Sequence, residues 1–120
     1  MTSTQAHAIG ICKKIITERL PVDYPTLDYT AHRVGIPART LQRRLNESGM
    51  SYSDLIEQTR REQARCMLHK PGTKVSTIAR ALGYADHSSF SRAFRRWTGI
   101  SPNAYKRRNL RLPVAGQVGT

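Results

Sequence analysis

Apolar residues recur along this chain at intervals of three and four, which is the spacing of one face of an α-helix. Ile9, Cys12, Ile16 and Leu20 form the first such stripe, and Pro21 ends it. Strict alternation of apolar and polar residues is rare, and there is no Asn-Gly or Asp-Gly hairpin turn. The pattern predicts an all-α fold of about seven helices.

Residues that commonly start or stop helices set the predicted boundaries. Ser51 and Asp86 are suitable N-caps, and either Thr73 or Ser76 caps the helix between them. The Lys-Pro-Gly run at 70–72 ends a long helix. The predicted helices span residues 6–20, 25–34, 37–48, 52–69, 73–82, 87–98 and 102–108.

One helix–turn–helix segment is present twice, at residues 31–51 and 79–101. Gly35 matches Gly83 in the turn, and Leu41 matches Phe90 in the helix that follows. The single-residue insertions between the copies fall only in turns. The repeat predicts a 6–108 domain made of a first helix–turn–helix subdomain (6–49), a long linker helix (51–70) and a second helix–turn–helix subdomain (73–108), followed by a flexible tail (109–120).

The chain is strongly basic, and its charge is uneven. The net charge is +12, from 20 basic and 8 acidic residues, and 15 of the basic residues are arginines. Residues 1–38 hold four basic and three acidic residues, whereas residues 86–120 hold seven and one. Because the excess of positive charge follows the repeat, nucleic acid is the expected partner.

Helical periodicity separates a buried face from an exposed face on the second helix of each repeat. Phe90, Ala93, Phe94 and Trp97 form the predicted buried stripe of residues 87–98. The opposite face presents Ser88, Arg92 and Arg95.

The equivalent helix of the first repeat has the same organisation. Leu41 and Leu45 are predicted to point inward, and the opposite face presents Arg39, Arg43 and Asn46. The two exposed triplets match one another under the repeat at an offset of 49 residues. Since a helix fits the major groove and arginine donates twice to guanine, both faces are predicted to contact base edges.

Residues beside these two faces are assigned individually. Gln42 is placed to pair with adenine. His87 lies at the start of its helix, where it is either a base contact or an exposed turn residue. Four basic residues away from the central faces are assigned to phosphate or to solvent: Arg44, Arg96, Lys106 and Arg107.

The linker helix is long enough to serve as a spacer. Its residues, about 18 in number, give a length of roughly 27 Å. Recognition helices that occupy successive major grooves lie about 34 Å apart. With the subdomain widths added, a monomer is expected to reach two half-sites on double-stranded DNA without forming a dimer.

Other classes of protein are disfavoured. No run of 18 apolar residues is present, and the N-terminus lacks the pattern of a signal peptide, so the cytoplasm is the expected location. Cys12 and Cys66 form no CxxC pair, and each is predicted to be a small buried residue on a helix. The four histidines are dispersed and no carboxylate pair is placed for acid–base chemistry, so we expect no enzyme, no metal and no cofactor.

Two other kinds of nucleic-acid binder use similar charge. A non-specific architectural DNA-binding protein shows no sequence preference, which the distinct exposed triplets disfavour. An RNA-binding module commonly stacks bases on exposed aromatic residues, and none is predicted on an exposed face here. Competition with random DNA distinguishes the first of these from a sequence-specific binder.

The residues that carry the repeat resemble a known family. ALGYADHSSFSRAFRRWTGISPNAYKRR, at 81–108, is similar to the second helix–turn–helix of AraC/XylS-type bacterial transcription regulators, and LQRRLNESGMSYSDLIEQTRREQA, at 41–64, resembles their first motif and linker. The resemblance covers about 6–108 and implies sequence-specific promoter binding, often as an activator that contacts RNA polymerase. It places base contacts at Arg39, Gln42, Arg43, His87, Ser88 and Arg92.

The chain departs from the family pattern at two positions. Pro37 stands where serine often caps the first recognition helix, and proline has no side-chain oxygen to cap it. Lys106 replaces a final arginine. Members of the family commonly carry a separate sensor domain, so we expect this segment to be a monomeric fragment of a longer regulator rather than a stand-alone protein.

Overall fold

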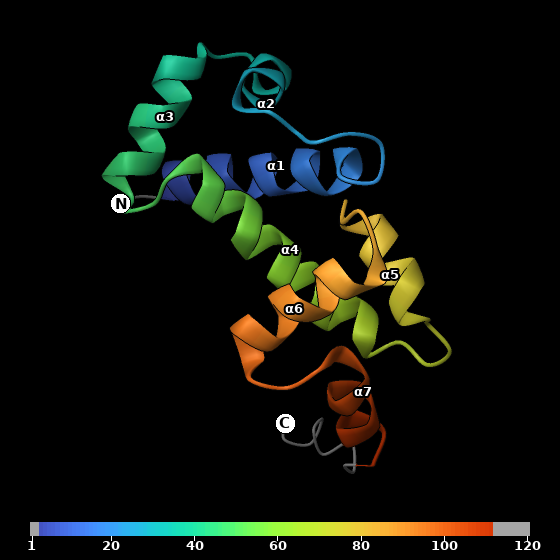
Figure 1. Ribbon diagram of the computed structural model, residues 1–120. Coiled ribbons are helices and arrows are strands. Elements are labelled where there is room, and N and C mark those ends of the chain that lie inside the picture. Colours follow the sequence, from blue (N-terminus) through green and yellow to red (C-terminus); the bar gives the residue numbers. More distant parts are fainter. Residues whose placement is uncertain (1–2, 112–120) are drawn as a thin grey trace. The chain divides into compact units, whose positions relative to one another are not determined.

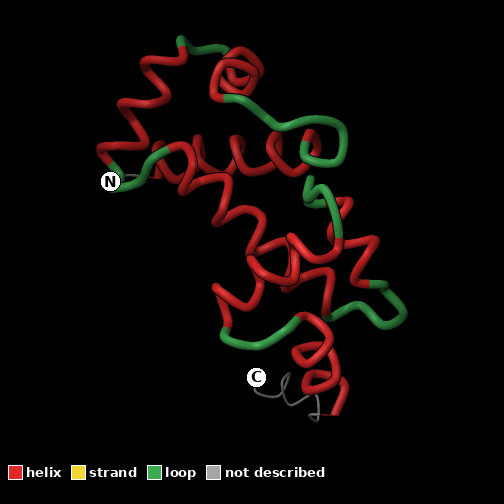
Figure 2. Tube along the Cα trace, viewed as in Figure 1, coloured by secondary structure: helices red, strands yellow, loops and turns green. Residues whose placement is uncertain are grey.

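The computed structural model describes residues 3–111 and contains helices without any strand in that range (Figures 1 and 2). The predicted all-α fold is confirmed. The helices are α1 (Ser3–Arg19), α2 (Leu27–Val34), α3 (Ala38–Glu47), α4 (Tyr52–Leu68), α5 (Val75–Ala81), α6 (His87–Thr98) and α7 (Pro102–Arg111).

Two predicted helix ends were wrong by three residues, and one predicted cap was wrong. α1 begins at Ser3, ahead of the first apolar residue of its stripe. Neither Thr73 nor Ser76 caps α5, because Lys74 has the extended backbone of the N-cap position and makes no side-chain cap bond. α7 continues to Arg111, so the start of the predicted tail is helical, and the rest of that tail lies outside the described residues.

The chain divides into two compact units, residues 1–60 and 61–120, and the division falls inside α4. In the first unit, Leu55 and Ile56 of α4 join a core formed with α1, α2 and α3. In the second unit, Ala64 and Leu68 of α4 join a core formed with α5 and α6. Each unit therefore obtains one side of its core from the same helix.

A partly buried hydrogen-bond cluster fixes the start of α4 within the first unit. The Tyr52 hydroxyl donates to the Pro25 carbonyl oxygen at 2.5 Å and accepts from the Thr30 hydroxyl at 2.8 Å. Burial raises the pKa of Tyr52 to about 12, so this hydroxyl keeps its proton. Ser51 caps α4 as predicted, because the Asp54 amide donates to its hydroxyl while the Asp54 carboxylate accepts from the Ser51 amide.

The two cysteines have different environments. Cys12 is fully buried in the first core, as predicted, and burial raises the pKa of its thiol. The prediction that Cys66 is buried was wrong, because Cys66 is exposed. Ala64 and Leu68 are the core-facing residues of this part of α4, and Cys66 lies midway between them, on the far side of the helix.

The second core is aromatic. Phe90 and Phe94 are fully buried, with ring centroids 5.9 Å apart, and Tyr105 of α7 meets the Phe94 ring edge-on at 5.2 Å. Trp97 also contacts Phe94 edge-on, at 6.2 Å, but it is only partly buried. The predicted stripe is therefore correct for Phe90, Ala93 and Phe94, and it was wrong to place Trp97 fully in the core at the end of α6.

We expect Phe94→Ala to lower the free energy of unfolding by about 3–5 kcal/mol, since it removes a buried ring that three other aromatic side chains contact. Trp97→Ala is expected to cost less, because part of the indole is already in contact with water. Urea unfolding followed by far-UV circular dichroism measures both. An equal or larger loss for Trp97→Ala would mean that the indole is the principal support of this core.

Candidate nucleic-acid interface

The first helix–turn–helix is formed by α2 and α3. The Tyr29 amide donates to the Thr26 hydroxyl at 3.1 Å, which caps α2. Gly35 follows α2 with φ of 90°, a left-handed conformation that favours glycine, and this turns the chain toward α3. Pro37 then holds the N-cap position of α3 without a side-chain cap bond, as its chemistry predicts.

α3 has one apolar face and one polar face. Leu41 and Leu45 are buried against the first core. The side chains predicted to contact bases all lie on the exposed surface of the helix: Arg39, Gln42, Arg43 and Asn46. The Arg43 guanidinium is paired with the Glu47 carboxylate one turn later, with Nε and Oε2 3.8 Å apart.

The second helix–turn–helix is formed by α5 and α6 and has a stronger helix start. Gly83, with φ of 82°, lies in the turn between them. The Ser89 amide donates to the Asp86 carboxylate at 2.7 Å, so Asp86 caps α6 as predicted. This hydrogen bond holds the pKa of the Asp86 carboxyl below its usual range.

α6 repeats the two-faced arrangement of α3. Its buried face carries Phe90, Ala93 and Phe94. Its predicted base-contacting residues are exposed: His87, Ser88, Arg92 and Arg95. Arg92 makes a weak contact with the Ser89 hydroxyl, at 3.4 Å, and has no carboxylate pair among the salt bridges found in residues 3–111.

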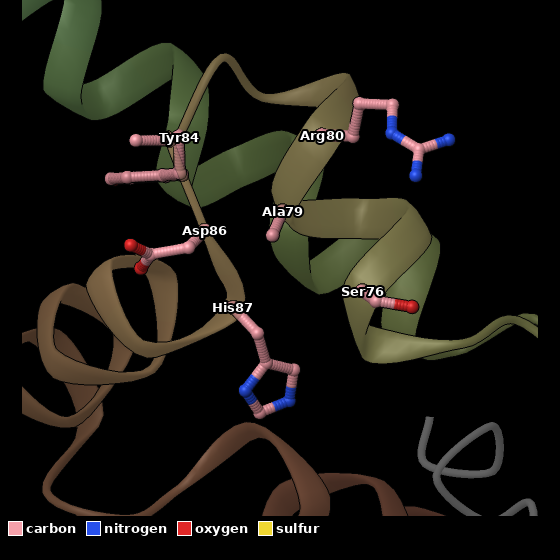
Figure 3. Close-up of a pocket in the computed structure, with 7 residues that line it drawn as sticks. Ser76, Ala79, Arg80, Tyr84, Asp86 and His87 are labelled. Atoms are coloured by element: carbon pink, nitrogen blue, oxygen red, sulfur yellow. The ribbon is translucent and has the colours of Figure 1, made fainter.

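A hollow of about 170 Å³ lies between α5 and the start of α6 (Figure 3). Asp86 and His87 turn their side chains in different directions, so the His87 ring points away from the capping carboxylate. Arg80 lies on the α5 side of the hollow and was not among the predicted site residues. Its exposed place on the first helix of a helix–turn–helix, the helix that crosses the DNA backbone, could have identified it.

The residues predicted to contact phosphate are in different situations. Arg44, Arg96 and Arg107 are exposed. Lys106 is partly buried, and its ammonium group donates to the Thr73 carbonyl oxygen. The lysine that departs from the family pattern is therefore engaged, at least in part, in joining α7 to the loop before α5.

Neither a metal centre nor a membrane segment is found in the described part of the chain. No group of three or more His, Cys, Asp or Glu side chains within residues 3–111 is placed to hold a metal ion. None of the helices in this range combines the length and the apolar character that crossing a bilayer requires.

The fold and its two exposed, arginine-bearing helix faces place this chain in the class of helix–turn–helix proteins. A sequence family described as a helix-turn-helix domain matches residues 30–108. The chain belongs to the AraC-type family of DNA-binding transcription regulators.

Known relatives are longer regulators. The HTH-type transcriptional regulator VirS of Mycobacterium tuberculosis is 38% identical over 100 residues, which are 83% of this chain and 28% of VirS. The chain thus spans less than a third of the length of this relative.

Solved structures have the same fold. A DNA-binding transcriptional dual regulator from Escherichia coli K-12 matches with a TM-score of 0.78 and 24% identity, over 88% of this chain and 94% of that one. The DNA-binding domain of the global transcriptional factor AdpA, solved in complex with a target DNA, matches with a TM-score of 0.65 and 25% identity, over 83% of this chain and 90% of that one.

The lowered pKa of Asp86 predicts a pH-dependent contribution to stability. A carboxyl whose pKa is lower in the folded state stabilises that state above its unfolded pKa, about 3.9, and this contribution disappears as the pH falls through the folded value. Asp86→Ala should therefore lower the melting temperature at pH 7, and the difference from the parent should shrink below about pH 4. Asp86→Asn, which keeps a capping oxygen, is the control and should retain most of the stability at pH 7. A difference between parent and Asp86→Ala that is constant from pH 7 to pH 3 would contradict this assignment.

Proposed function

We propose that this chain binds double-stranded promoter DNA in a sequence-specific way and regulates transcription as an activator, with α3 and α6 in successive major grooves. The observation that carries the proposal is the pair of exposed polar triplets on α3 and α6. They match at an offset of 49 residues, and each lies opposite a buried stripe in a chain of net charge +12.

Each proposed contact follows from side-chain chemistry. Arginine donates two hydrogen bonds to the O6 and N7 atoms of guanine, and glutamine or asparagine pairs with adenine in a similar way. These bonds require side chains that are free to leave the helix surface, and exposure of both polar faces supplies that freedom. The base contacts we propose are Arg39, Gln42, Arg43 and Asn46 from α3, and His87, Ser88, Arg92 and Arg95 from α6.

Phosphate contacts hold the two helices in register on the duplex. Arg44, Arg96 and Arg107 are proposed for this role from the sequence, and the position of Arg80 beside the start of α6 supports adding it. The ammonium group of Lys106 has three N–H donors, and one of them is used in the bond to the Thr73 carbonyl oxygen. The remaining donors are proposed to contact phosphate.

The proposed activity belongs to a bacterial regulator acting on DNA in the cytoplasm. One copy of this segment presents both recognition helices, so binding to DNA as a monomer is expected. Contact with RNA polymerase at the promoter accounts for activation. Sensing of an effector is assigned to other parts of a longer protein, in keeping with the length of its relatives.

Selection of sites from random DNA, followed by competition, is the direct test of the proposed function. Arg43→Ala and Arg92→Ala should each cost about 1–3 kcal/mol on the selected site and relax base preference in one half of it. We expect the loss at Arg92 to be at least as large, because α6 has a capped first turn and α3 does not. Arg108→Ala is the control, because Arg108 is an exposed residue outside both recognition helices.

All three variants should keep a melting temperature near that of the parent, because the substituted side chains are exposed. If Arg43→Ala and Arg92→Ala weaken binding equally on every sequence, these arginines bind the backbone. The proposed base readout by α3 and α6 in successive major grooves is then rejected.

Binding should also depend steeply on salt. About six to ten phosphate contacts predict a fall in affinity of roughly 10³- to 10⁵-fold between 50 and 200 mM salt. Fluorescence anisotropy on a labelled duplex measures the slope. A flat response would contradict an interface built on arginine and phosphate.

A further inference from the structure

The two recognition helices differ in where they carry negative charge. Glu47 is the single acidic residue of α3, and its carboxylate lies 3.8 Å from Nε of Arg43. The offset of 49 residues that superposes the exposed triplets places Arg96 at the equivalent position of α6. The first copy of the repeat therefore has a carboxylate one turn after its proposed base-contacting arginine, whereas the second copy has an arginine at that position.

Helix stability does not account for Glu47. A carboxylate in the last turn of a helix opposes the helix dipole. The order arginine then glutamate, four residues apart, is the weaker orientation for such a pair. The two side chains are 61% and 60% exposed, a setting in which ion pairs add little to stability. The position calls for an explanation outside the folding of α3.

At the start of α6 the acidic residue near Arg92 is Asp86, and its carboxylate has a different role from that of Glu47. The Asp86 carboxylate is engaged by the Ser89 amide at 2.7 Å, where it caps the helix. Arg92 contacts the neutral Ser89 hydroxyl and interacts electrostatically with the Asp86 carboxylate without pairing with it, and Arg96 adds positive charge one turn further on. Within its own residues α6 carries three arginines and no acidic residue, whereas α3 carries three arginines and Glu47.

We infer that Glu47 is the specificity-determining residue of α3, an inference that rests on the proposed function. Its carboxylate lies beside the Arg43 guanidinium and offsets that residue's attraction for phosphate. The Glu47 carboxylate repels a phosphate, which is anionic, whereas a guanine edge is neutral and offers the guanidinium two acceptors in one plane. Since non-specific binding is almost entirely attraction for phosphate, Glu47 weakens it more than it weakens binding to the selected site.

The test compares Glu47→Gln with the parent on the selected duplex and on random duplex of equal length. The variant should bind random DNA about two- to fivefold more tightly, and the selected site less than twofold more tightly. The slope of log affinity against log salt on random DNA should steepen by about 0.9. Glu57→Gln, which removes an exposed carboxylate from α4 in the same unit, is the control for net charge.

A second comparison shows whether Glu47 acts through Arg43. In an Arg43→Ala background, Glu47→Gln should change the ratio of selected to random affinity by less than twofold. An equal change with and without Arg43, or an equal change in Glu57→Gln, overturns the inference. If the parent itself fails to prefer the selected duplex, the proposed function has failed. If the parent shows the preference and Glu47→Gln behaves like the parent, this inference alone has failed.

Discussion

Each helix–turn–helix in this chain must bury a narrow apolar stripe, and the helices of one unit offer little surface with which to do so. Small domains bury a small fraction of their surface and are correspondingly marginal. α4 meets this constraint by supplying side chains to two cores, Leu55 and Ile56 to one and Ala64 and Leu68 to the other. The buried faces of α3 and α6, and thus the exposure of their polar faces, depend on those contributions.

Much of the fold could be predicted because its signals are local. Asp86 caps α6 and Ser51 caps α4 through bonds to residues three positions away, and each was recognisable from residue type alone. Leu41 and Leu45 follow the helical period in the middle of α3, where a residue's facing is well determined. Such features depend on near neighbours in the sequence, so they require no knowledge of the tertiary structure.

The features that were missed depend on position within the packed unit. Trp97 follows the period of its stripe, but it lies in the last turn of α6, where less of the core remains to cover it. Cys66 was assigned from the usual preference of cysteine for the interior, whereas its place opposite Ala64 and Leu68 exposes it. Lys106 meets a carbonyl 33 residues earlier in the chain, and the pairing of Arg43 with Glu47 depends on side-chain conformation. Residue types and spacing do not reveal the bond of Lys106, whereas the spacing of Arg43 and Glu47 on one helix makes their pair possible without fixing its geometry.

The division of the chain at residue 60 has a consequence for how the protein reaches its folded state. The buried residues of one core all precede that point and those of the other all follow it, so each core closes within a continuous half of the sequence. Low contact order of this kind reduces the chain entropy lost before native contacts form, and it favours rapid folding. An N-terminal core of this kind can also assemble during synthesis, before the second half of the chain has left the ribosome.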